Sequence, residues 1–84
     1  MTGTGSSGPG LDDFVQHRDL LFTIAYEITG SVADAEDVVQ ESYLRWQEAA
    51  RTTEIGNPRA YLARIATRQA LNRQRGNARR REDY

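Results

Sequence analysis

The chain has 84 residues, with eleven arginines, no lysine, one histidine, no cysteine and a formal net charge of −1. This length predicts one small domain, and the lack of cysteine and near-lack of histidine exclude disulfides and thiolate or histidine-rich metal sites. No apolar run approaches the ~18 residues of a membrane span and no signal-peptide pattern opens the chain, so the expected location is the cytoplasm.

The small net charge conceals a strong segregation of charge along the chain. Residues 1–57 carry ten acidic residues and three arginines, a balance of −7, whereas residues 58–84 carry eight arginines and two acidic residues, a balance of +6. An acidic front and a basic back predict two partners of opposite charge. Self-association of the chain, front against back, is the structural alternative.

The first part of the chain predicts a tail and one helix. Residues 1–10 are rich in glycine, serine and threonine, a composition typical of a flexible tail, and we assign them no function. Apolar residues then follow a helical period, and Gly30 suits a left-handed C-cap, so the sequence predicts a helix over 11–29. His17 is predicted to be a partly buried structural histidine.

The second predicted helix covers residues 32–50. Ser31 and Asp34 form a capping pattern, and apolar residues recur with the helical period as far as Trp46, which we expect in the core. The opposite side of this helix carries residues about one turn apart, here named the acidic stripe: Asp37, Gln40, Glu41, Leu44 and Glu48. Acid and amide groups around one exposed leucine suit the docking of a basic partner, whereas an ordinary solvated helix face is the alternative.

The basic end of the chain predicts a loop and a third helix. Residues 51–56 lack apolar periodicity, and Asn57-Pro58 provides a cap and a first helical residue, so we predict a helix over 58–75 that frays from Gly76 onward. Its arginines, interleaved with asparagine, glutamine and tyrosine, are typical of a nucleic-acid-binding face, although solvated arginine-rich helices are also common. Short connections around the middle helix predict an all-α fold, a compact bundle of three main helices.

Taken in this order, these motifs resemble region 2 of bacterial sigma factors, specifically the extracytoplasmic-function (ECF) group. The resemblance rests on Asp37-x-x-Gln40-Glu41 followed by Tyr61-Leu62-x-Arg64-Ile65-Ala66, and it covers roughly residues 12–81. The stretch 57–72 and the closing RRREDY look closest to the subgroup whose full-length members carry a C-terminal SnoaL-like extension. The resemblance implies a sigma region 2 helical domain over 11–84. The family's region 4 domain is absent, so we expect an excised domain or part of a truncated protein.

The resemblance also implies two functional surfaces. The acidic stripe would dock on the coiled coil of the RNA polymerase β′ clamp. The loop before the third helix would capture a base flipped out of the promoter −10 element, and the third helix would follow the melted non-template strand. The DNA-binding residues so implied are Ile55, Gly56, Asn57, Arg59, Arg64, Arg68, Asn72, Arg75 and Arg79. An anti-sigma factor or a regulatory extension is a further implied partner.

Two other functions fit parts of the pattern. A helix-turn-helix-type regulator would read double-stranded DNA, and a non-catalytic helical module would self-associate through its opposite charges. An enzyme is not expected, because the sequence offers no cysteine nucleophile, no paired histidine and carboxylate on one predicted face, and no phosphate-binding glycine loop. We expect no cofactor and no metal.

Overall fold

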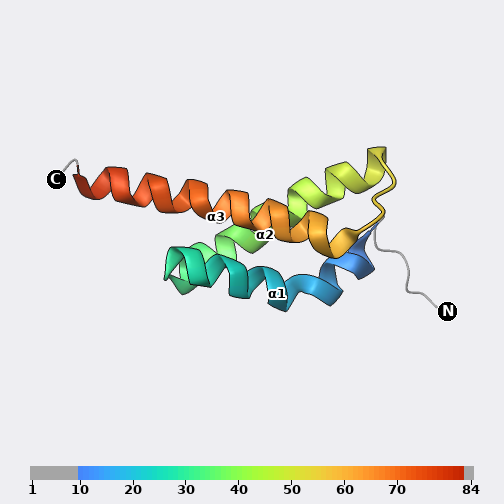
Figure 1. Ribbon diagram of the computed structural model, residues 1–84, viewed down its shortest axis with the longest axis horizontal. Helices are drawn as coiled ribbons and strands as arrows, with labels where there is room; N and C mark the ends of the chain where they lie inside the picture. Colours follow the sequence, from blue (N-terminus) through green and yellow to red (C-terminus); the bar gives the residue numbers. More distant parts are fainter. Residues whose placement is uncertain (1–9, 83–84) are drawn as a thin grey trace.

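Three α-helices make up the part of the chain that the computed structural model describes, residues 10–82 (Figure 1). They are α1 (Leu11–Thr29), α2 (Val32–Thr52) and α3 (Pro58–Glu82), and each packs against both of the others. The predicted all-α bundle of three main helices is therefore confirmed. Within this part of the chain, no helix combines the length and the apolarity that crossing a bilayer requires.

The core lies between the three helices and contains four alanines beside larger apolar side chains. Its buried apolar residues are Phe14, Leu21, Ala25, Ala35, Val38, Val39, Trp46, Leu62, Ala66 and Ala70. Leu62, Ala66 and Ala70 follow at intervals of four on α3, and such small side chains let neighbouring helices approach closely. Ile65 and Gln69 of α3 are only half-buried.

Local signals set the end of α1 and the starts of α2 and α3 where the sequence placed them. The hydroxyl of Ser31 accepts a hydrogen bond from the backbone N–H of Asp34 at 3.2 Å. Gly30 has a φ of 70°, and its N–H donates to the Tyr26 carbonyl, closing α1. The side-chain oxygen of Asn57 accepts from the N–H of Ala60 at 3.1 Å, which caps α3.

Gly10, assigned by sequence to the tail, belongs instead to the folded domain. It adopts a φ of 78° at the start of α1, and its carbonyl oxygen accepts hydrogen bonds from the N–H of Phe14 at 3.1 Å and from the Nε1 of Trp46 at 2.7 Å. A Cβ atom at this position would lie 2.7 Å from that nitrogen. The rest of the predicted tail, residues 1–9, lies outside the described residues, as do residues 83–84.

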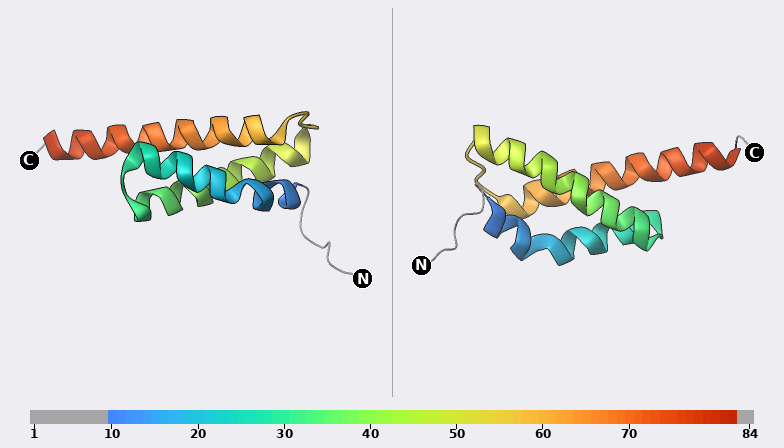
Figure 2. Two further views of the ribbon diagram at one scale, coloured as in Figure 1. Left: turned by 60° about the horizontal axis from the view of Figure 1, so that its bottom comes forward. Right: turned by 180° about the vertical axis from the view of Figure 1, so that it is seen from behind.

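The helix α3 continues past the end that the sequence predicted at Arg75 and reaches Glu82. Figures 1 and 2 show its C-terminal part running beyond the ends of α1 and α2. Gly76 lies within the helix and does not end it. Side chains at 73, 74 and 77 contact the facing ends of α1 and α2, and these contacts offset the cost of a glycine in a helix interior. α2 likewise ends at Thr52, two residues beyond the predicted end.

Candidate functional site

The acidic stripe lies on the solvent side of α2, and all five of its side chains are exposed. Leu44 is 60% exposed, an unusual position for a large apolar side chain. Glu41 pairs with Arg45 and Glu48 pairs with Arg51 within the helix, each at 3.6 Å. Exposed ion pairs of this kind contribute little to stability, so both carboxylates remain available to another partner.

Asp37 differs from the rest of the stripe because its partner comes from α3. The Nη2 of Arg73 lies 3.1 Å from Oδ2 of Asp37, and the Nη1 of Arg73 lies 3.5 Å from Oδ1 of Asp34. Asn77 adds a hydrogen bond of 2.8 Å from its Nδ2 to Oδ2 of Asp34. The sequence carries no signal for these contacts, because they join residues more than thirty positions apart.

The predicted DNA-binding arginines of α3 remain exposed along the helix. Arg59, Arg64, Arg68, Arg75 and Arg79 are all exposed, and none of them forms an ion pair within the described part of the chain. We name four of them the arginine face: Arg64, Arg68, Arg75 and Arg79. Asn72 lies beside this face and accepts a hydrogen bond of 3.2 Å from Arg75. This uncompensated positive charge suits a polyanion.

The candidate residues in the loop between α2 and α3 differ from one another in burial. Ile55 is half-buried and packs against the core, which anchors the loop. Gly56 and Asn57 are exposed, and Asn57 also caps α3 through its side-chain oxygen. The structure thus confirms the predicted cap at Asn57 and gives Ile55 a contact with the core that the sequence did not predict, while Gly56 lies open to solvent.

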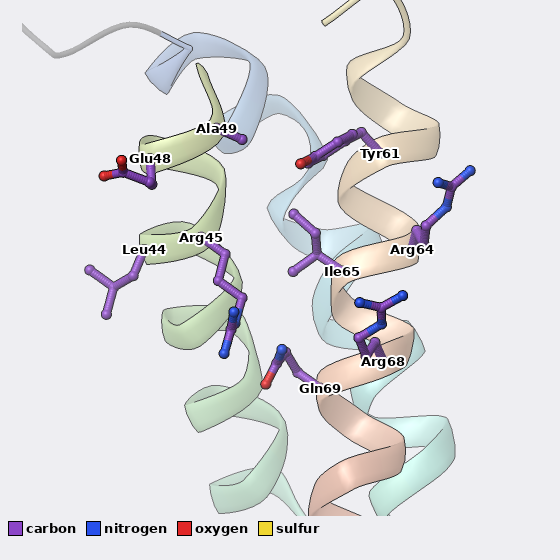
Figure 3. A pocket seen from close by; sticks show the side chains of 9 residues that line it. All are labelled: Leu44, Arg45, Glu48, Ala49, Tyr61, Arg64, Ile65, Arg68 and Gln69. Carbon is purple, nitrogen blue, oxygen red and sulfur yellow. The ribbon is translucent and has the colours of Figure 1, made fainter. Parts of the chain in front are cut away.

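A groove between α2 and α3 brings the two predicted surfaces together (Figure 3). Leu44 and Glu48 of the acidic stripe line one side, and Arg64 and Arg68 of the arginine face line the other. The remaining lining residues are Arg45, Ala49, Tyr61, Ile65 and Gln69. The ring of Tyr61 packs edge-on against buried Trp46, with ring centroids 5.9 Å apart, so one wall of the groove rests directly on the core.

Comparison with known proteins shows which protein family the chain resembles. Residues 14–80 match the sigma-70 region 2 family. The chain is 45% identical over 74 residues to the ECF RNA polymerase sigma factor SigJ of Mycobacterium tuberculosis, a match that covers 88% of this chain and 23% of SigJ. It is 35% identical over 81 residues to the ECF sigma factor SigE of Mycolicibacterium smegmatis, covering 93% of this chain and 32% of SigE.

A third relative is the ECF sigma factor SigG of Mycobacterium tuberculosis, 40% identical over 73 residues, with 81% of this chain and 20% of SigG covered. The chain thus spans between a fifth and a third of the length of these relatives. No solved structure matches the chain. The family match and the three relatives agree with the motifs on α2 and α3, and we conclude that the chain belongs to the sigma-70 region 2 family, within its ECF group.

Proposed function

We propose that this domain takes part in transcription initiation by joining RNA polymerase to promoter DNA in the cytoplasm. The acidic stripe of α2 docks on the coiled coil of the polymerase β′ clamp. The arginine face of α3 and the loop before it hold the melted non-template strand of the −10 element. The domain acts by binding alone, without a covalent step. An anti-sigma factor or regulatory extension would act by covering one of these surfaces, and membership of the subgroup with a SnoaL-like extension stays a prediction.

One observation carries this proposal: Leu44 and Glu48 of the acidic stripe and two residues of the arginine face, Arg64 and Arg68, line a single groove between α2 and α3. A basic helical partner finds carboxylates around Leu44 on one side of the groove, so electrostatic attraction and an apolar anchor act together. A nucleic-acid backbone finds unpaired guanidinium groups on the other side. The arrangement supports simultaneous binding of a basic and an acidic partner.

The mechanism on the DNA side is capture of an opened strand. Extruding a base from a duplex costs a few kcal/mol, which contacts to the extruded base and to the backbone must offset. Arg64 and Arg68 supply backbone contacts, while Gly56, Asn57 and Arg59 lie where the loop enters α3. We infer that the exposed end of the loop receives the base and that Ile55, held against the core, keeps this end in place.

Binding of the 84-residue chain to the isolated β′ clamp coiled coil tests the docking half of the proposal. The informative variant is Gln40→Ala with Leu44→Ala, because both side chains are exposed and neither forms a hydrogen bond within the described residues. If Leu44 is a docking anchor, affinity falls about tenfold or more. Asp37 is left unchanged, since its substitution would also remove an ion pair with α3.

The matched control is Val32→Ala with Glu36→Ala, which truncates one exposed apolar and one exposed polar residue of α2 outside the stripe. Circular dichroism should show equal helicity for both double variants. Equal weakening by both variants, or no binding by the parent chain, contradicts docking through the stripe.

The DNA-binding half of the proposal is tested by comparing the affinity of the chain for single-stranded and for double-stranded DNA. A pool of labelled single strands should bind more tightly than the same pool annealed into duplexes. A preference for the duplex would favour the helix-turn-helix-type regulator instead.

A further inference from the structure

Three side chains of α3 hold this helix against the junction of α1 and α2. Arg73 contacts Asp34 and Asp37, Asn77 donates to Asp34, and Gln74 donates from its Nε2 to the Ile28 carbonyl at 3.0 Å. We name this set of contacts the polar clasp. Within it, Asp34 is the central acceptor: its side chain is 22% exposed and contacts both Arg73 and Asn77.

The clasp lies where α3 leaves the bundle. Beyond it the helix projects past the ends of the other two helices (Figures 1 and 2). The end of α3 contains a glycine, and its last residues form a short projecting segment with little intrinsic tendency to stay helical, because short isolated helices are marginal in water. A Cβ atom at Gly76 would meet nothing within 4 Å, so packing at that residue does not hold the segment.

Helical continuity through the clasp decides where two arginines point. Arg75 and Arg79 lie seven and eleven residues after Arg68, so they share its face only while the helix is unbroken. Arg73 lies two residues before Arg75 and therefore on the other side of the helix, where its charge is engaged by two carboxylates. Among residues 58–79 of α3, whose side chains the structure describes, the arginines are thus of two kinds: five are open to solvent and Arg73 is turned to α2.

We infer that the polar clasp is a positioning device for DNA binding, with Arg73 and Asp34 as positioning residues that do not touch the DNA. The clasp keeps α3 helical past Gly76 and so holds Arg75 and Arg79 in line with Arg64 and Arg68 along one strand. This inference rests on the proposed function of α3 as the strand-binding helix.

The test uses a variant for which simple electrostatics and the proposed clasp predict opposite changes in DNA affinity. Asp34→Ala removes one negative charge, which by electrostatics alone should strengthen binding to a polyanion. If the clasp positions Arg75 and Arg79, the same variant instead weakens binding of the 84-residue chain to a fluorescein-labelled oligo-deoxythymidine about three- to tenfold. The slope of log affinity against log salt should also fall by up to about 1.4, since two phosphate contacts on a single strand are lost.

Glu36→Ala is the matched control. Glu36 is an exposed acidic residue in the same part of α2 as Asp34, but it does not belong to the clasp. It should leave DNA binding equal or slightly tighter. A second comparison uses the variant Arg75→Gln with Arg79→Gln, in which adding Asp34→Ala should weaken binding no further. Far-ultraviolet circular dichroism and urea unfolding verify that the bundle itself remains folded in each variant.

The outcomes separate the two claims. If the parent chain binds no single-stranded DNA, the proposed function and this inference both fail. If the parent chain binds and Asp34→Ala behaves like Glu36→Ala, only the inference is overturned. It is also overturned if Asp34→Ala weakens binding equally in the variant that lacks Arg75 and Arg79, because the effect would then not pass through those arginines.

Discussion

The indole Nε1 of Trp46 donates a hydrogen bond of 2.7 Å to the carbonyl oxygen of Gly10, and this bond joins the late part of α2 to the first turn of α1. Trp46 is only 2% exposed and lies among the largest buried side chains of the domain. Its ring also packs against Tyr61, which lines the groove between α2 and α3. One side chain therefore links all three helices and supports a wall of the candidate site.

Replacing Trp46 by phenylalanine should destabilise the domain. The variant loses the bond to Gly10 and leaves unfilled volume in the core, and these losses together cost about 2–4 kcal/mol in the free energy of unfolding. Urea unfolding followed by circular dichroism measures this, since the only tryptophan has been removed. A change of less than about 0.5 kcal/mol, typical of surface substitutions, would mean that the bond and the packing are not important.

Gly10→Ala should cost more stability than Gly30→Ala. Both glycines have positive φ, of 78° and 70°, so alanine pays a similar backbone strain of about 1 kcal/mol at each. Only at Gly10 does the new Cβ also approach a buried side chain, whereas at Gly30 it meets nothing within 4 Å. Thermal unfolding of the two variants side by side isolates the cost of the contact between the new Cβ at position 10 and the Trp46 side chain. Equal melting temperatures would mean that this contact costs no stability.

Gly76→Ala should stabilise the protein. The residue lies inside α3 with open space around it, and alanine is favoured over glycine in a helix interior by about 0.5–1 kcal/mol. Part of this gain comes from the smaller conformational freedom of the unfolded chain. Differential scanning calorimetry should show a higher melting temperature. A lower one would show that this position requires the flexibility of glycine.

The salt dependence of DNA binding should show how much each residue of the arginine face contributes to contacts with phosphates. Arg64→Gln and Arg68→Gln should each weaken binding to single strands and lower the slope of log affinity against log salt by about 0.7. Arg18→Gln, which removes an exposed arginine from α1, serves as the comparison. If all three variants reduce the slope equally, binding follows net charge and not a defined face.

Sequence alone determined the helix caps and which candidate functional residues are exposed. Ser31, Gly30 and Asn57 mark helix ends because their capping groups bond to residues only three or four positions away. The acidic stripe and the arginine face could be predicted as exposed because helical periodicity assigns each residue a face. Their roles in docking and in DNA binding stay predictions.

Tertiary structure alone decided how these parts act on one another. Arg73 engages Asp37 of the stripe and Gly10 joins the core through Trp46, and in both cases the partners lie 36 positions apart in the chain. Ile55 packs against the core, which local periodicity did not predict. The extension of α3 to Glu82 has the same origin: local propensity at Gly76 favours an end, and contacts with Asp34 and Ile28 oppose it. Helix periodicity carries no information about such pairs, because they depend on how three helices cross once their apolar faces are buried together.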